Sequence, residues 1–157
     1  MLFRSYDADS LVEQSRRPAP ELVHGAGAIA WGDGRFLVAG GLPVGVKENY
    51  LYEYDEQFRF RRRHVLESGY TLMGIQTAAY ADGVWYFGCY GSPQVLLWAD
   101  RSFRLLGKQP FQAALGLVPL PDGRFLVARG KTEKKSSHSA RVQLALPDEK
   151  TGLRLLE

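Results

Sequence analysis

Two short turn signals alternate along the whole chain, and they constrain its fold more than any other feature. The first is an Asp-Gly pair between two runs of apolar or small residues, found at Asp33-Gly34, Asp82-Gly83 and Asp122-Gly123. The second is an aspartate that closes an apolar or aromatic run, found at Asp7, Asp55, Asp100 and Asp148. Because the two signals strictly alternate, with spacings of 40 to 49 residues within each series, we predict a repeat protein.

Composition limits the class of protein further. At 157 residues, with 45% hydrophobic and 24% charged residues, the chain has the size and composition of one globular domain. No apolar run approaches the roughly 18 residues of a membrane span, and the N-terminus lacks the pattern of a signal peptide. We therefore expect a cytoplasmic protein without membrane contact. The net charge of +3 is too modest to predict a nucleic-acid partner, and we expect no cofactor.

Each Asp-Gly pair has the residues of a tight β-hairpin. Such a pair between two apolar runs favours a type I′ turn, in which both central residues have positive φ. The runs that follow the turns are almost wholly apolar, namely residues 36–38, 85–87 and 125–127. Strands of this kind are typically buried on both faces, whereas half-exposed strands alternate apolar with polar residues. We expect a second strand of each repeat that is sandwiched between neighbouring sheets.

A second hairpin follows each first one, around Asp55, Asp100 and Asp148. The opening residues 2–14 fit the same template, with Asp7 at the turn. A competing interpretation is a short helix from Ser10 to Arg17, because Ser10 and Glu13 have the spacing of a capping box. Pro18 and Pro20 would limit that helix to about two turns. We prefer the hairpin.

Two consecutive hairpins in each unit of about 45 residues make a four-stranded antiparallel blade. In this the chain resembles the β-propeller superfamily. It lacks the Gly-His to Trp-Asp pattern of WD40 repeats and the Ser-x-Asp-x-Gly-x-Thr-Trp box of sialidases, so the resemblance names no family within the superfamily. It implies an all-β fold, a partial β-propeller of about three and a half blades within one repeat domain, residues 1–157. The expected units are a half-blade at 1–18 and blades at 24–66, 72–110 and 113–157.

Three and a half blades do not close a ring, since propellers have 4 to 8 blades. The outermost blades would then present apolar faces larger than soluble monomers expose. Either copies of the chain self-associate, or further blades belong to a longer protein. The half-blade, an outer hairpin without an inner one, favours the second explanation.

Function in such a fold is expected in the loops between second and third strands and between blades. These loops vary in length from repeat to repeat, and binding residues concentrate in variable loops on a rigid scaffold. The candidate ligand-binding residues are Lys47, Glu48, Asn49, Tyr70, Gln76, Tyr90, Ser92, Lys134, Lys135 and His138. The lysine-rich residues 130–140 are interpreted as a solvated loop, with an electropositive rim for an acidic ligand as the alternative.

Other reactive residues have structural interpretations. The arginines at 59 and 61–63 are expected to protect an exposed edge strand from aggregation, with anion binding as the alternative. His24, His64 and His138 lack the local spacing of metal ligands, and no metal site is predicted. Cys89 has no basic neighbour in sequence, so we expect a buried structural thiol.

The functional interpretation is a non-catalytic binding module that recognises a protein or a glycan-like or acidic ligand. Two alternatives stay open: a fragment of a propeller enzyme of the glycoside-hydrolase or sialidase-like kind, and an oligomer-forming scaffold. The candidate acids of the enzyme alternative are Glu48, Glu67 and Glu133.

Overall fold

The computed structural model describes residues 1–43, 45–134 and 137–156, with only the backbone described at residues 131–134, 137 and 138. A two-stranded sheet, the half-blade, consists of β1 (Leu2–Tyr6) and β2 (Glu13–Pro18). Blade 1 consists of β3 (Ala26–Gly32), β4 (Arg35–Gly40), β5 (Asn49–Tyr54) and β6 (Phe60–Leu66). Blade 2 consists of β7 (Ile75–Ala81), β8 (Val84–Cys89), β9 (Val95–Asp100) and β10 (Leu105–Pro110). Blade 3 consists of β11 (Gly116–Pro119), β12 (Phe125–Lys134), β13 (Ser137–Asp148) and β14 (Gly152–Leu155).

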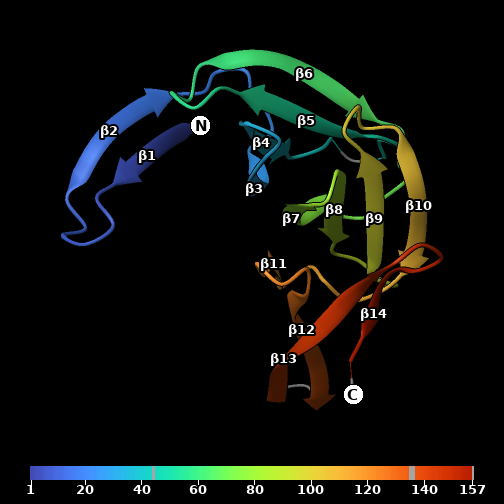
Figure 1. Ribbon diagram of the computed structural model, residues 1–157. Coiled ribbons are helices and arrows are strands. Elements are labelled where there is room, and N and C mark those ends of the chain that lie inside the picture. The colour runs from blue at the N-terminus through green and yellow to red at the C-terminus, as the bar shows by residue number, and fades with distance from the viewer. Residues whose placement is uncertain (44, 135–136, 157) are drawn as a thin grey trace.

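The sheets follow one another around an open arc (Figure 1). In each blade the strands pair antiparallel in the order in which they occur in the chain. The first strands β3, β7 and β11 lie toward the inside of the arc, and β6, β10 and β14 lie on its outside (Figure 1). The predicted fold class, an all-β partial propeller with four-stranded blades repeating about every 45 residues, is confirmed, and the described residues contain no helix.

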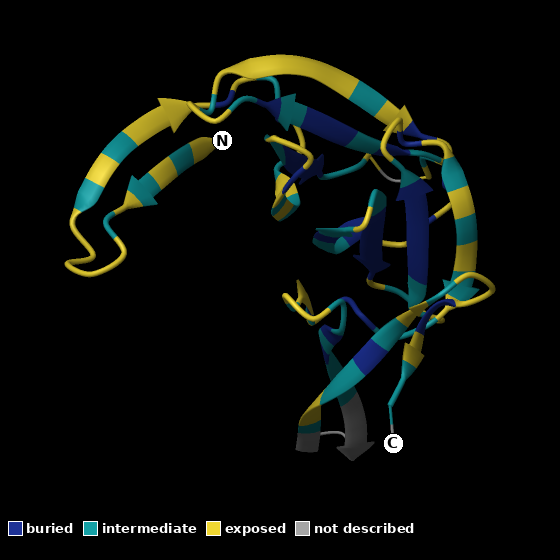
Figure 2. Cartoon of the chain, viewed as in Figure 1, coloured by how far each residue is buried: buried dark blue, intermediate teal, exposed yellow. Residues whose placement is uncertain are grey.

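The core lies between the sheets. Trp85 and Phe87 of β8 are fully buried and share a cluster with Leu37 and Leu51 of blade 1. Phe125 of β12 packs edge-on against Tyr86 of blade 2, with ring centroids 5.0 Å apart. Figure 2 shows this burial in the middle strands, while β2 and β6 are largely exposed. Each blade is thus stabilised mainly by its neighbours along the arc.

Burial of the second strands follows the prediction in two of three blades. Strands β4 and β8 are buried on both faces over most of their length. In β12, Phe125 and Val127 are buried, but Leu126 and Ala128 are only half-buried. The prediction is wrong for β12 because blade 3 has a neighbouring blade on one face alone within the described chain.

The first-hairpin turns agree with the predicted type in two repeats. Asp33 and Gly34 have φ of 53° and 70°, and Asp82 and Gly83 have φ of 49° and 84°, as a type I′ turn requires.

The prediction is wrong at the third turn. There Gly123 has positive φ but Asp122 does not. In a two-residue loop the residue before Asp122 must donate its backbone N–H across the turn, and Pro121 has none. The backbone N–H of Leu120 donates to the carbonyl of Arg124 instead, at 2.7 Å, which lengthens the turn.

The aspartates of the second hairpins hold their turns together. The Asp100 carboxylate accepts the backbone N–H groups of Ser102 and Arg104 at 2.9 and 3.0 Å, and Phe103 between them has a φ of 64°. Backbone N–H groups are bound in the same way by Asp7, Asp55 and Asp148. These backbone hydrogen bonds lower the pKa of all four carboxyl groups. The repeated aspartates are therefore structural residues.

The opening segment forms the predicted hairpin. Strands β1 and β2 pair from Leu2 opposite Pro18 to Tyr6 opposite Glu13. The hydroxyls of Ser5 and Ser15 bond to each other at 2.7 Å across this pair. The helical alternative is excluded, because the residues that would form it lie in the turn and in β2.

Candidate functional site

The connections divide the domain into two ends. The aspartate turns lie at one end of the strands, here called the turn face. The connections β4–β5 and β8–β9, together with the segments 67–74 and 111–115 that join successive blades, lie at the other end, here called the loop face. Adjacent strands run antiparallel, so this separation follows directly from the topology.

Segment 67–74 is held to both blades by hydrogen bonds from polar side chains. The side chain of Asn49, at the start of β5, donates to Ser68 Oγ at 2.7 Å and to Thr71 Oγ1 at 3.1 Å. From blade 2, Lys108 Nζ donates to the backbone carbonyls of Ser68 and Tyr70 at 2.8 and 3.2 Å. Asn49, Ser68 and Thr71 are all buried, so the two bonds that Asn49 donates are shielded from competition with water. The segment is a fixed part of the blade junction.

Four large apolar or aromatic side chains on this anchored junction remain exposed. Tyr70, Leu72 and Met73 are 50%, 57% and 59% exposed, and Tyr90 on the β8–β9 connection is 45% exposed. The two segments are adjacent, because a Cβ at Gly91 would lie 3.4 Å from that of Leu72. We call these four side chains the loop-face patch.

Several of the candidate residues chosen from sequence lie on the segments around this patch. Gln76 is half-buried and donates from its side chain to the carbonyl of Met73 at 2.9 Å. Ser92 and Lys47 are exposed on the neighbouring β8–β9 and β4–β5 connections. Glu48 hydrogen-bonds to the hydroxyl of Tyr50, and this bond raises the pKa of the phenol.

One predicted ligand residue lies elsewhere than expected. Asn49 is 1% exposed, so its side chain faces the interior and positions the segment that carries Tyr70. Among the described residues, its Oδ1 has no hydrogen-bond partner.

The lysine-rich candidates are not tested. Lys135 lies outside the described residues, and the side chains of Lys134 and His138 are not described. Their backbones belong to β12 and β13, which extend the blade 3 hairpin.

The arginines in β6 and directly before it have local partners. Arg59 and Arg61 bind the Asp55 carboxylate, each at 2.8 Å, and Arg62 binds Glu53 at 3.3 Å. The guanidinium of Arg63 lies over the Tyr50 ring, 4.8 Å from its centroid. These contacts fit the interpretation of an edge strand protected by charge better than an anion site.

His64 and Cys89 have structural surroundings. His64 Nε2 lies 2.7 Å from Glu53 Oε2, and the His64 ring contacts Phe103 at the junction of blades 1 and 2. Burial raises the pKa of the Cys89 thiol to about 12, which removes it as a nucleophile at neutral pH. The part of the chain that the structure describes contains no group of three His, Cys, Asp or Glu residues arranged to hold a metal ion.

A depression of about 490 Å³ lies on the turn face between blades 2 and 3, lined by Tyr86, Trp98 and Leu106. Asp82 and Asp148 lie at it, but the Asp148 carboxylate already binds the backbone of its own turn. At least one acidic group at this depression, the Asp148 carboxylate, therefore has a structural role.

No protein-family model matches the chain, and a search of curated proteins gives no significant match. Within the described residues, no helix is long and apolar enough to cross a bilayer.

Sequence reasoning found the aromatic members of the loop-face patch but missed Leu72, Met73 and the anchor Lys108. A usable signal for the first two was present: two consecutive large apolar residues lie in a connection, outside both hairpins of the repeat. Lys108 carried no such signal, because its role depends on the packing of β10 against a segment 38 to 40 residues earlier.

Proposed function

We propose that this chain is a non-catalytic binding module of the β-propeller superfamily, and that the loop-face patch docks apolar side chains of a protein partner. The observation that carries the proposal is the contrast within one segment. Ser68 and Thr71 are buried and bonded, while Tyr70, Leu72 and Met73 are exposed. A cluster of exposed apolar side chains promotes aggregation unless a partner covers it, so such a cluster marks an interaction site.

The composition of the patch favours a protein over a glycan. Two aromatic rings, Tyr70 and Tyr90, suit either ligand, because they stack on sugars and also pack against apolar side chains. Leu72 and Met73 offer no hydrogen bonds to sugar hydroxyls, and methionine adapts well to varied apolar partners. Aromatic residues and methionine are also enriched at protein interfaces.

The anchoring of segment 67–74 supports the same proposal. Binding to a flexible loop costs conformational entropy for every side chain that becomes ordered. Here Asn49 holds the segment through the hydroxyls of Ser68 and Thr71, and Lys108 holds it through backbone carbonyls, from two different blades. The patch is thus preorganised, and the exposed polar residues Lys47 and Ser92 lie on connections of the same face.

The test uses the chain itself as bait for a displayed library of random peptides. We expect selected peptides rich in apolar and aromatic residues, whose affinity falls at least about tenfold for the variant Leu72→Asp. The matched control is Val142→Asp, an equally large change at an exposed valine of β13 in blade 3. Peptides that bind both variants as tightly as the original chain would refute the proposal.

A further inference from the structure

The half-blade is an outer hairpin without an inner one. It has the aspartate turn of the other outer hairpins, and its Phe3 packs against Tyr54 and Phe58 of blade 1, with ring centroids 5.3 and 5.4 Å away. Strands β5, β9 and β13 each pair on both sides, but within the described residues β1 pairs with β2 alone. One edge of β1 therefore presents unpaired backbone N–H and C=O groups.

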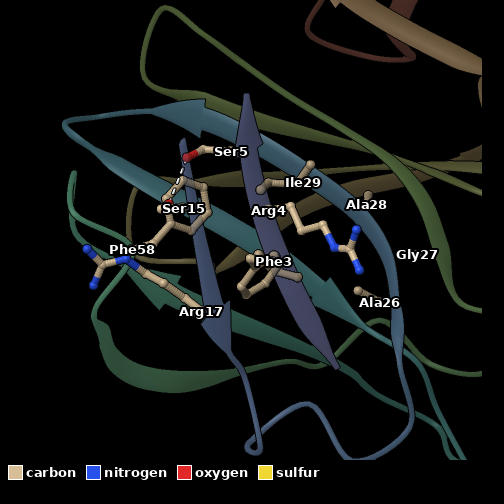
Figure 3. Close-up of a pocket in the computed structure, with 11 residues that line it drawn as sticks. Phe3, Arg4, Ser5, Ser15, Arg17, Ala26, Gly27, Ala28, Ile29 and Phe58 are labelled. Carbon is tan, nitrogen blue, oxygen red and sulfur yellow. Dashed lines mark hydrogen bonds between the residues drawn. The ribbon is translucent and has the colours of Figure 1, made fainter. Parts of the chain in front are cut away.

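A groove lies beside this edge. It has a volume of about 330 Å³ and separates the half-blade from the inner strands of blade 1 (Figure 3). Phe3, Ser5 and Ser15 line it on the side of the half-blade. Residues 26–29 of β3 form the opposite wall, and their side chains are small except for Ile29.

The other blades show what covers this wall elsewhere in the chain. Ala78 and Tyr80 of β7 belong to the cluster between blades 1 and 2, where Ala28 and Leu37 of the preceding inner hairpin share it. The corresponding residues of β3 are Ile29 and Trp31, which are 50% and 47% exposed. The outer part of the same face is already covered, because Val38 is fully buried beneath the half-blade. The groove therefore continues the interface between the half-blade and blade 1 toward the inner strands.

We infer that this groove is a docking site for a β-hairpin of a partner polypeptide, which adds its second strand to the free edge of β1 and completes the blade. The chain's own inner hairpins define the chemistry of this partner. The side chains that they turn toward the following blade are alanines on the first strand and mainly apolar residues on the second, as in Ala28, Ala30 and Leu37. The partner hairpin has the same small-then-apolar pattern and an Asp-Gly type of turn.

A folded second copy of the chain does not fit the site. Its three inner hairpins, β3–β4, β7–β8 and β11–β12, are each already paired with an outer hairpin of the same blade. Strand addition requires a hairpin whose second strand has a free edge. The occupant is therefore a hairpin of a different polypeptide and not a folded copy of this chain.

The experiment adds a synthetic hairpin peptide to the full chain. The probe has the sequence of residues 26–40, and its control carries the change Leu37→Pro, which removes a backbone donor from the pairing strand. We expect the probe to slow hydrogen exchange of backbone amides in residues 2–6 by at least about tenfold and the control peptide to leave it unchanged.

Two protein variants make the test specific. Ile29→Lys places a charge in the groove at a side chain that is already half exposed, so the fold tolerates it. We expect at least about tenfold weaker binding of the probe to this variant. Val142→Lys, at a valine of β13 that is 66% exposed, is the matched control and should bind as the original chain does. Circular dichroism checks that both variants are folded.

Three results would overturn the inference. The first is no binding of the probe at about millimolar concentration. The second is binding that leaves exchange in β1 unchanged. The third is equal affinity for Ile29→Lys and Val142→Lys. None of these results bears on the loop-face patch, whose residues lie at the junction of blades 1 and 2.

Discussion

Replacing Asn49 by alanine tests whether buried hydrogen bonds fix the segment that carries the loop-face patch. The change removes two donated bonds, of 2.7 and 3.1 Å, to the hydroxyls of Ser68 and Thr71. Each such bond contributes about 1 kcal/mol net. Ser68 keeps a partner, since its hydroxyl also donates to the carbonyl of Gly69, and the unpaired Oδ1 of Asn49 disappears. We therefore expect a loss of about 2 kcal/mol in the free energy of unfolding.

Urea denaturation at neutral pH measures this loss, with Lys47→Ala as the matched control. Lys47 is exposed on the β4–β5 connection, close to Asn49 in sequence. Surface substitutions of this kind change the free energy of unfolding by no more than about 0.5 kcal/mol. Hydrogen exchange adds a local measurement, because the amides of residues 67–74 should exchange faster in Asn49→Ala. A loss no larger than that of the control, or unchanged exchange in this segment, would refute the anchoring role of Asn49.

Three further predictions concern the structural residues. The aspartates of the outer turns have a lowered pKa in the folded state, so the stability that they contribute is present above the unfolded pKa of about 3.9 and is lost as the pH falls through the folded value. Measuring the unfolding free energy as the pH is lowered should show this loss of stability. The loss should be smaller in Asp100→Asn, and an equal loss in that variant would contradict the role assigned to Asp100. Trp85→Ala should cost about 3–5 kcal/mol, but Trp85→Phe should cost clearly less, because phenylalanine leaves a smaller cavity and the indole N–H has no partner among the described residues. Equal costs in denaturation would contradict this. Cys89 should resist thiol labelling at about pH 8 until the chain unfolds, and rapid labelling of the native protein would show that the thiol is accessible.

Turn chemistry made most of the fold predictable from sequence. An Asp-Gly pair specifies its turn locally, through the positive φ of both residues, and Asp33 and Asp82 behave accordingly. The third turn departs from the rule because of Pro121, a neighbour whose missing N–H changes the register. The burial of β12 was not predictable in the same way, since it depends on which blades flank the strand.

The site was less predictable because packing between blades decides which residues of the connections are buried and which are exposed. Asn49 reads as a polar loop residue in sequence, yet the approach of segment 67–74 turns it into a buried anchor. Leu72 and Met73 are large apolar residues, yet they are exposed, because Ser68 and Thr71 take the buried positions of the segment. Local composition specifies the hairpins, but contacts between residues about 20 to 40 positions apart decide which face of a connection reaches solvent.

Mapping where a selected peptide contacts the chain tests the proposed function most directly. A titration followed by backbone amide chemical shifts distinguishes the two ends of the blades. The proposal predicts that the largest changes fall in residues 67–74 and 90–94, around Tyr70, Leu72 and Tyr90. Changes confined to the turn face, around Asp33, Asp82 and Asp100, would contradict it.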